Sequence, residues 1–410
     1  MPESSVERGR RAGPDAGDGR ESLVQSLRAI PAPGWVLFAG TLVNKFGNYL
    51  QVFLVLYLTS RGYSAGVAGV ALGLAGLGNF AGNAVGGAAT DRFGRRRVIA
   101  VSMFGSAAFT ALVPFVDGLP AILLLVGLAG FFAQLYRPAA AALLLDVVPE
   151  PQRVTAFAAY RMAINVGMAL GPVLGGYLSG RSYALIFLLD ALSSVVYGLL
   201  AILALPDTGR PAAAARPAPG ATLTPLLDRR FAVFLAAMFA SSLVYVQTMA
   251  MLPVHVVSAG LPNSAYGILL GVNALVVIAI ELPVTHRLQR VPAHLVIAAG
   301  LVVLGLGLGA TNFAATLPAL LGTVLIWTLG EIVASPIATT VPGRRAPGDL
   351  RGAYQGAFAA ALTLAYCVGP ALGGLLFSRG QALLWGACAA VDAGSAVLVL
   401  LAGRVEERER

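Results

Sequence analysis

Charged residues are scarce in this chain. They make up 11% of its 410 residues, whereas hydrophobic residues make up 57%. A soluble protein of this size needs roughly 25% charged residues to cover its surface. The shortage excludes nucleic-acid-binding proteins and ordinary cytosolic enzymes, and it predicts that lipid is the main solvent of the chain.

Residues that build disulfide frameworks and metal sites are also rare. The two cysteines, Cys367 and Cys388, lie inside apolar stretches, and the three histidines show no metal-ligand spacing. We therefore expect neither a disulfide framework nor a metal site. No phosphate-binding loop is present, so we expect no ATP and no other cofactor. A single lysine, Lys45, stands against 27 arginines, a composition that suggests a GC-rich bacterial gene.

Long apolar runs fill most of the chain. Each is close to the ~20 residues that cross a bilayer. Helices are the structure expected, because lipid-exposed backbone must satisfy its hydrogen bonds internally. The sequence therefore predicts an all-α integral membrane protein with twelve helices, at 34–59, 66–88, 98–116, 119–146, 154–179, 182–204, 231–255, 265–286, 294–312, 316–341, 352–377 and 382–402.

Basic residues lie mostly on one side of this arrangement. The two tails and the loops after even-numbered helices hold 22 of the 28 Lys and Arg residues. By the positive-inside rule, both termini are cytoplasmic and the chain lies in the cell membrane.

The expected domains are a disordered tail (1–33), a six-helix bundle (34–204), a flexible linker (205–230), a second six-helix bundle (231–402) and a short tail (403–410).

The two halves repeat one another at an offset of 198 residues. The segment GPVLGGYL (171–178) returns as GPALGGLL (369–376), and Pro138 and Arg153 match Pro336 and Arg351 in the same register. Two related six-helix halves joined by a flexible segment are typical of transporters that work by alternating access.

The loop after the second run has the sequence GAATDRFGRRR (87–97). Gly94 permits a tight turn, and the arginines hold the loop at the membrane surface. A generic basic loop would explain the arginines, but neither Asp91 nor the glycine spacing.

This block resembles the loop 2–3 signature of the major facilitator superfamily. In that family the signature is a conformational latch that engages the other half of the protein in the outward-facing state. The resemblance implies two pseudo-symmetric six-helix bundles, and it assigns the latch to Gly87, Asp91, Arg92, Gly94, Arg95 and Arg96, with Asp146 as the partner of a motif arginine. The matching turn of the second half (284–290) lacks the aspartate, so the latch is expected to be one-sided.

The fifth run carries a glycine and proline pattern that resembles the antiporter signature of drug:proton exchangers. Its residues are Gly167, Gly171, Pro172, Gly175 and Gly176. Plain helix packing is the alternative, because small residues spaced by four let helices approach closely in lipid. The buried helix-4 arginine of that branch is absent, since Val126 and Gly127 occupy its region.

Ionisable residues inside the membrane are functional candidates because each is costly to place there. They are Lys45, Arg137, Arg161 and Asp190 in the first half, and Glu281, Glu331 and Asp392 in the second. Glu331 is the preferred proton carrier, followed by Glu281. Structural pairing is the alternative for Arg137 and Arg161, and polar packing against nearby serines is the alternative for Asp190 and Asp392.

The sequence therefore predicts a secondary transporter, and not an enzyme, that exports small amphipathic molecules or drugs, cationic ones included, in exchange for protons. The alternative is a transporter of the same fold dedicated to one metabolite, such as a sugar, amino acid, siderophore or organic anion; Lys45 and Arg137 would suit an anionic group. A membrane-bound enzyme or a sensor would need a catalytic constellation or an appended domain, and neither is seen. The expected partners are the substrate, protons and the lipid bilayer, with no nucleic acid, and the expected state is a monomer.

Overall fold

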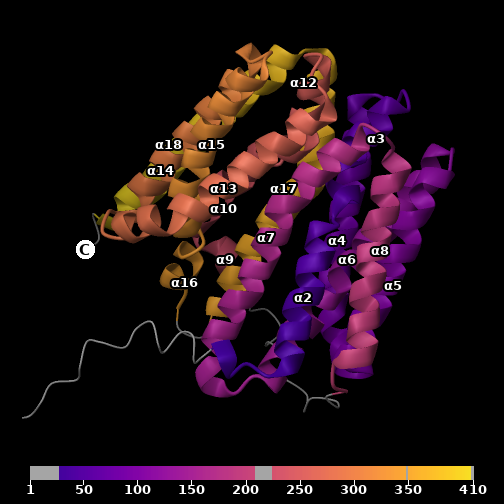
Figure 1. Cartoon of the computed structure of the whole chain (residues 1–410). Helices are drawn as coiled ribbons and strands as arrows, with labels where there is room; N and C mark the ends of the chain where they lie inside the picture. The colour runs from indigo at the N-terminus through magenta and orange to yellow at the C-terminus, as the bar shows by residue number, and fades with distance from the viewer. Residues whose placement is uncertain (1–26, 208–223, 348–349, 408–410) are drawn as a thin grey trace, which may run out of the picture.

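The computed structural model describes residues 27–207, 224–347 and 350–407, and within these ranges it contains helices and no β-strand. The helices form two bundles (Figure 1). The predicted all-α membrane fold is confirmed.

Residues 32–204 supply the first bundle. Its helices are α2 (Ala32–Phe46), α3 (Tyr49–Ser60), α4 (Ala65–Phe93), α5 (Arg95–Leu112), α6 (Leu119–Val147), α7 (Arg153–Ser179) and α8 (Tyr183–Ala204). Two short 3₁₀ turns, Val113–Phe115 and Glu150–Gln152, follow α5 and precede α7.

Residues 224–407 supply the second bundle. Its helices are α9 (Thr224–Leu227), α10 (Arg229–Tyr245), α11 (Gln247–Ala250), α12 (Leu252–Ser258), α13 (Asn263–Leu288), α14 (Ala293–Ala310), α15 (Leu317–Ala338), α16 (Val341–Arg345), α17 (Arg351–Arg379) and α18 (Gln381–Glu407).

Eleven helices of the described chain are long and apolar enough to cross a membrane. The remaining predicted run, 34–59, is the first of the twelve. It is divided at Gly47 and Asn48 into α2 and α3, so the expectation of one unbroken helix there was wrong. The run at 231–255 is likewise divided at Val246 and Met251. Breaks of this kind are tolerated inside a bundle where other groups satisfy the freed backbone.

Some predicted boundaries differ from the helix ends. Within the predicted linker, α9 forms at Thr224 and α10 begins at Arg229, because Asp228 caps α10 by accepting hydrogen bonds from the backbone N–H groups of Arg230 and Phe231. Helix α18 continues into the predicted tail as far as Glu407. Residues 1–26 of the first tail and 208–223 of the linker lie outside the described residues.

The two bundles share one apolar core at one end and have separate cores at the other. The shared core joins Phe53 and Leu54 of α3 to Met251, Leu252 and Tyr266 of the second bundle. One separate core lies within residues 30–205 and the other within residues 231–399. The bundles accordingly converge toward α3 and α12 and diverge toward α9 and α16 (Figure 1). We call these the closed end and the open end.

Glycines allow the bundles to touch at the closed end. A Cβ at Gly69 of α4 would collide with the backbone carbonyl of Pro370 in α17, and one at Gly267 of α13 would collide with that of Pro172 in α7. Gly69 and Gly267 are 198 residues apart, as are Pro172 and Pro370. The two contacts are therefore pseudo-symmetric copies of one contact.

Replacing Gly69 with valine should separate α4 from α17, because the new side chain meets the Pro370 carbonyl. Cys367 is 7% exposed at this seam and can report the separation. In a Cys388→Ala background, we expect Gly69→Val to react with N-ethylmaleimide several times faster than its parent. Gly322→Val is the control, since no heavy atom lies within 4 Å of a Cβ built there. Equal labelling rates would contradict the packing argument.

Candidate functional site

A cavity of about 280 Å³ lies between the two bundles, and we call it the central cavity. Its wall comes from α3, α4 and α6 of the first bundle and from Val246, α11 and α17 of the second. It contains seven polar side chains, which are Gln51, Asn79, Asn83, Gln134, Arg137, Thr363 and Tyr366. Leu72, Phe80, Val246, Met249 and Leu362 supply the apolar wall. The site is suited to a small amphipathic molecule.

Arg137 is the only charged residue among those that line the central cavity. It lies near the middle of α6 and is exposed. Lys45 lies on α2, with its Nζ 5.7 Å from the centroid of the Tyr136 ring. It is close enough to interact electrostatically with both Arg137 and Asp190. The structure thus brings together three predicted candidates in the first bundle.

Glu331 lies on α15 and is held by two hydrogen-bond donors. Tyr245 Oη donates to Glu331 Oε1 over 2.8 Å, and Asn273 Nδ2 donates to Oε2 over 3.0 Å. Asn273 Nδ2 also donates to Thr328 Oγ1. Glu281 is near enough to interact electrostatically with Glu331. Sequence reasoning found both glutamates but missed Tyr245 and Asn273.

Asp190 supports the break in the first transmembrane run. Its Oδ2 accepts a hydrogen bond of 2.9 Å from the backbone N–H of Leu50, in the first turn of α3. The residue before α3, Asn48, provides no side-chain cap. A carboxylate from α8 therefore caps α3 from outside its own helix, which favours the polar-packing alternative for Asp190.

Asp392 and Arg161 do not line the central cavity. Asp392 is fully buried on α18, against Gly305 of α14. Arg161 is exposed on α7. Neither shares a hydrogen bond or an ion pair with the other predicted residues in the described part of the chain.

The loop 2–3 block joins α4 to α5 at the open end. Gly94 is the single residue between the helices, and its φ of 86° lies in the left-handed region that favours glycine. Arg95 is buried, and its Nε lies 2.9 Å from Asp146 Oδ2 at the end of α6. Arg96 donates a hydrogen bond to the carbonyl of Ile202 in α8.

The remaining members of the block face outward. Asp91 and Arg92 are exposed, and the guanidinium of Arg92 lies 5.3 Å from the centroid of the Phe93 ring. No heavy atom lies within 4 Å of a Cβ built at Gly87. The block is thus fixed to its own bundle through Arg95 and Arg96, while Asp91 stays accessible.

The glycine pattern of α7 serves two contacts. A Cβ at Gly167, Gly171 or Gly175 would collide with α2 or α3. Gly176 and Pro172 instead meet Gly267 of α13 in the other bundle. This one helix therefore packs its own bundle and also forms part of the contact between bundles, which agrees with the helix-packing alternative.

A second ionic cluster lies at the open end of the second bundle and was not foreseen. Arg345 Nε and Nη2 donate to the two oxygens of Asp228 over 2.8 and 3.1 Å, and Tyr354 Oη donates to Asp228 Oδ2 over 3.3 Å. Partial burial of Asp228 opposes its ionisation, but the Arg345 hydrogen bonds and the backbone N–H donors outweigh burial and lower the pKa of the carboxyl. An aspartate just before an apolar run is the sequence signal for such a cap.

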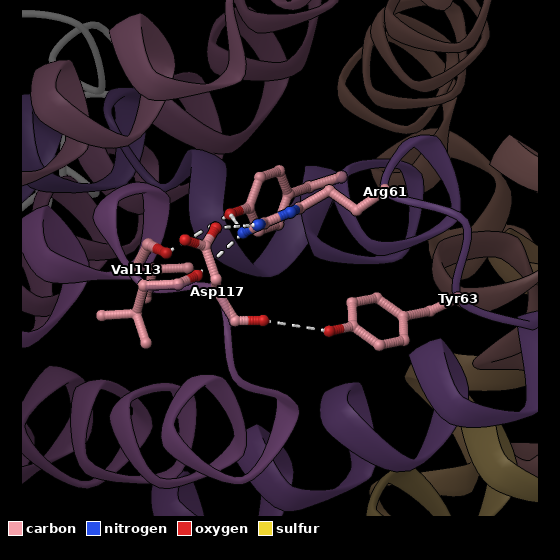
Figure 2. Close-up of polar contacts among 6 residues, drawn as sticks. Arg61, Tyr63, Val113 and Asp117 are labelled. Atoms are coloured by element: carbon pink, nitrogen blue, oxygen red, sulfur yellow. Dashed lines mark hydrogen bonds and ion pairs between the residues drawn. The ribbon is translucent and has the colours of Figure 1, made fainter.

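A third polar cluster links the closed ends of α3 and α5. Figure 2 shows Arg61 pointing toward Asp117, with which it forms an ion pair, and the Tyr63 hydroxyl pointing toward the Asp117 carbonyl. Arg61 also donates to Tyr57 Oη and to the carbonyl of Val116. The hydrogen bonds with Tyr57 and Asp117 raise the pKa of the Arg61 guanidinium. The cluster ties the first two loops of the closed end together.

Removing the Asp190 carboxylate should weaken the fold. Asp190→Leu leaves the α3 N–H group without an acceptor in an apolar region, so we expect a loss of about 1–3 kcal/mol in unfolding free energy. Asp190→Asn retains one acceptor oxygen and should keep most of the stability. Thermal unfolding of the purified protein in nanodiscs measures the difference. Equal losses in the two variants would refute the capping role.

The comparisons with known proteins agree with this architecture. The sequence model of the Major Facilitator Superfamily matches residues 37–370. The uncharacterized MFS-type transporter YqjV of Bacillus subtilis is 28% identical, with 85% of this chain and 87% of that protein covered. The multidrug resistance protein MdtH of Aeromonas hydrophila is 28% identical, with 83% and 87% covered.

Solved transporter structures show the same fold. The nucleoside transporter NupG superposes with a TM-score of 0.76 at 14% identity, covering 91% of this chain and 98% of that one. A mutant of the peptide transporter POT, in complex with alafosfalin, superposes with a TM-score of 0.74 at 16% identity, covering 95% and 98%. The family model matches more than half of the chain, so the protein is a transporter and not an enzyme. The chain belongs to the major facilitator superfamily.

Proposed function

We propose that this transporter exports small amphipathic molecules by alternating access and couples their movement to protons at Glu331. The observation that carries the proposal is the position of Glu331, a membrane-embedded carboxylate that Tyr245 and Asn273 hold near enough to interact electrostatically with Tyr366 of the cavity wall. The similarity to relatives named multidrug resistance protein MdtH supports export of such molecules.

Proton uptake at Glu331 would change its hydrogen bonds. A carboxylate accepts from both Tyr245 and Asn273, whereas a carboxylic acid must also find an acceptor for its own proton. Tyr245 is followed by Val246, which lines the central cavity, and Tyr366 of the cavity wall interacts electrostatically with Glu331. A proton at Glu331 can therefore alter the cavity wall without entering the cavity.

We place the open end at the cytoplasm. It carries the arginines of the loop 2–3 block, and Arg344 and Arg345 of α16 lie at the same end. By the positive-inside rule this side faces the cytoplasm of the cell membrane, so the conformation is inward-facing. The two bundles, 34–204 and 231–402, would rock about the central cavity while the segment 205–230 joins them, and the working unit would be a monomer.

The loop 2–3 block would act as the latch of the outward-facing state. In the inward-facing conformation, Arg95 is held by Asp146 within its own bundle while Asp91 remains exposed. When the open end closes, Asp91 would be available to pair with the second bundle. The Asp228–Arg345 cluster would brace the facing surface of that bundle.

A transporter dedicated to one metabolite is the second candidate. Arg137 favours it, because a single cation in the cavity wall suits the recognition of one defined anionic group. The glycine pattern of α7 does not separate the two candidates, since its glycines contact α2, α3 and α13 and not the cavity.

Glu331→Gln should abolish proton-driven export, because glutamine keeps the size of the side chain but cannot take up a proton. We would load cells with rhodamine 123, a cation, or with fluorescein methyl ester, an anion of the same shape, and follow efflux with and without an uncoupler. We expect the uncoupler-sensitive component to fall to the level of cells that lack the protein. Glu150→Gln, at an exposed acid outside the spans, is the control and should match wild type.

The outcome also separates the candidates. Uncoupler-sensitive efflux that survives in the Glu331→Gln/Glu281→Gln double variant would overturn proton coupling at this pair. Absence of efflux of both dyes, despite normal expression in the membrane, would favour the dedicated-metabolite transporter.

Asp91→Asn should slow efflux several-fold without weakening substrate binding, because it would destabilise only the conformation in which the latch is engaged. Initial efflux rates and dye binding to the purified protein measure the two quantities. Gln289→Asn, at the equivalent position 198 residues later, is the matched control. A variant that exports at the wild-type rate would rule out the latch role of Asp91.

A further inference from the structure

The wall of the central cavity carries a positive charge and no negative one. Arg137 lines it, and none of the lining residues is acidic. In the described part of the chain Arg137 takes part in none of the ion pairs. A positive potential inside a low-dielectric region acts strongly on any charged molecule that enters.

None of the acidic side chains of the membrane region, Asp190, Glu281, Glu331 and Asp392, is among the residues that line the cavity. Asp190 caps α3, and Glu331 accepts hydrogen bonds from Tyr245 and Asn273. Asp392 is fully buried against α14, away from the cavity wall. A cation in the cavity would therefore meet Arg137 without a lining carboxylate to offset the repulsion.

Hydrogen-bond donors surround Arg137 on the same wall. Asn79 and Asn83 are one turn apart on α4, and Gln134 precedes Arg137 by three residues on α6, so all three amides can face one bound group. Thr363 and Tyr366 offer hydroxyl groups from α17 of the other bundle. An oxyanion needs several donors arranged around it, and this wall supplies them from both bundles.

The apolar part of the wall suits the rest of such a molecule. Leu72 and Phe80 come from α4, and Val246, Met249 and Leu362 come from the second bundle. A ligand with one charged end and an apolar body would place its charge at Arg137 and its body against these side chains.

We propose that the transported molecule is a small amphipathic organic anion, such as a carboxylate, sulfonate or phosphonate, whose charged group binds Arg137. This inference rests on the proposed function of the central cavity as the substrate site. The sequence suggested a cationic substrate, because the second half holds more membrane-embedded acids than the first. The proposal differs from that expectation because none of these acids lines the central cavity.

A binding experiment tests the proposal independently of transport. The probes are fluorescein methyl ester and rhodamine 123, which share one ring skeleton and carry opposite charges. We would measure their affinity for the purified full-length protein in nanodiscs by fluorescence anisotropy at pH 8. We expect wild type to bind the anion at least about tenfold more tightly, as a charge-assisted hydrogen bond in a partly desolvated site allows.

Three variants identify the residue responsible. Arg137→Gln should lose the anion preference, and Arg137→Lys should retain much of it because the charge remains. Arg161→Gln, which removes an exposed arginine outside the cavity, should leave both affinities unchanged. Gel filtration and thermal unfolding establish that each variant is folded.

Three results would overturn the proposal: wild type binding the two dyes equally, wild type preferring the cation, or Arg137→Gln keeping the anion preference. Failure of wild type to bind either dye would overturn it as well. Because no proton gradient is present, none of these outcomes bears on proton coupling, which the efflux experiment tests separately.

Discussion

Hydrocarbon offers no hydrogen bonds, and the structure depends on this constraint throughout. A polar group inside the bundles is costly unless it has a partner in the protein or a position on an aqueous cavity. The break between α2 and α3 is possible because Asp190, from a different helix, accepts a hydrogen bond from the backbone N–H of Leu50, which would otherwise lack an acceptor. Glu331 is tolerated because Tyr245 and Asn273 donate to it. Arg137 is tolerated because it lines the central cavity. Asp190 thus supports the fold by capping a helix, whereas Glu331 and Arg137 are the candidates for function.

The same constraint explains how two bundles can move against each other. Their contact at the closed end uses backbone carbonyls approached by glycines, as at Gly69 and Pro370 and at Gly267 and Pro172. The shared apolar core adds side-chain contacts, such as Phe53 against Tyr266, but among the described residues no ion pair joins the bundles there. At the open end, the ion pairs of the described residues lie within each bundle, Arg95 with Asp146 and Asp228 with Arg345. Each bundle can therefore move as a unit, which is what alternating access requires.

Much of this architecture could be predicted from the sequence, because lipid imposes a simple rule on composition. The helix runs and the short list of membrane-embedded charges follow from apolar length and from the residues that interrupt it, and the family resemblance comes from the loop 2–3 block. The break at Gly47 and Asn48 could not be predicted, since the acceptor that permits it lies 140 residues away along the chain. The cavity amides were missed for a related reason. Asn79 and Asn83 are uncharged, so they stand out only when the helix face that they share is known to border a cavity.

The placement of charge limits how protons and substrate can be coupled. If the proton and the substrate bound the same carboxylate, they would compete for it, as the membrane-embedded acids of the second half suggest. Arg137 and Glu331 instead belong to different bundles, and only Arg137 lines the cavity. The anion and the proton would thus bind separate residues, and exchange requires that each favours a different conformation of the two bundles. Coupling must then pass through the groups between them, Tyr245 with its neighbour Val246, and Tyr366 on the facing wall. In such an arrangement the proton changes the shape of the cavity wall and the electric field across the cavity. Recognition of the charged group of the substrate is a separate task of Arg137 in the first bundle.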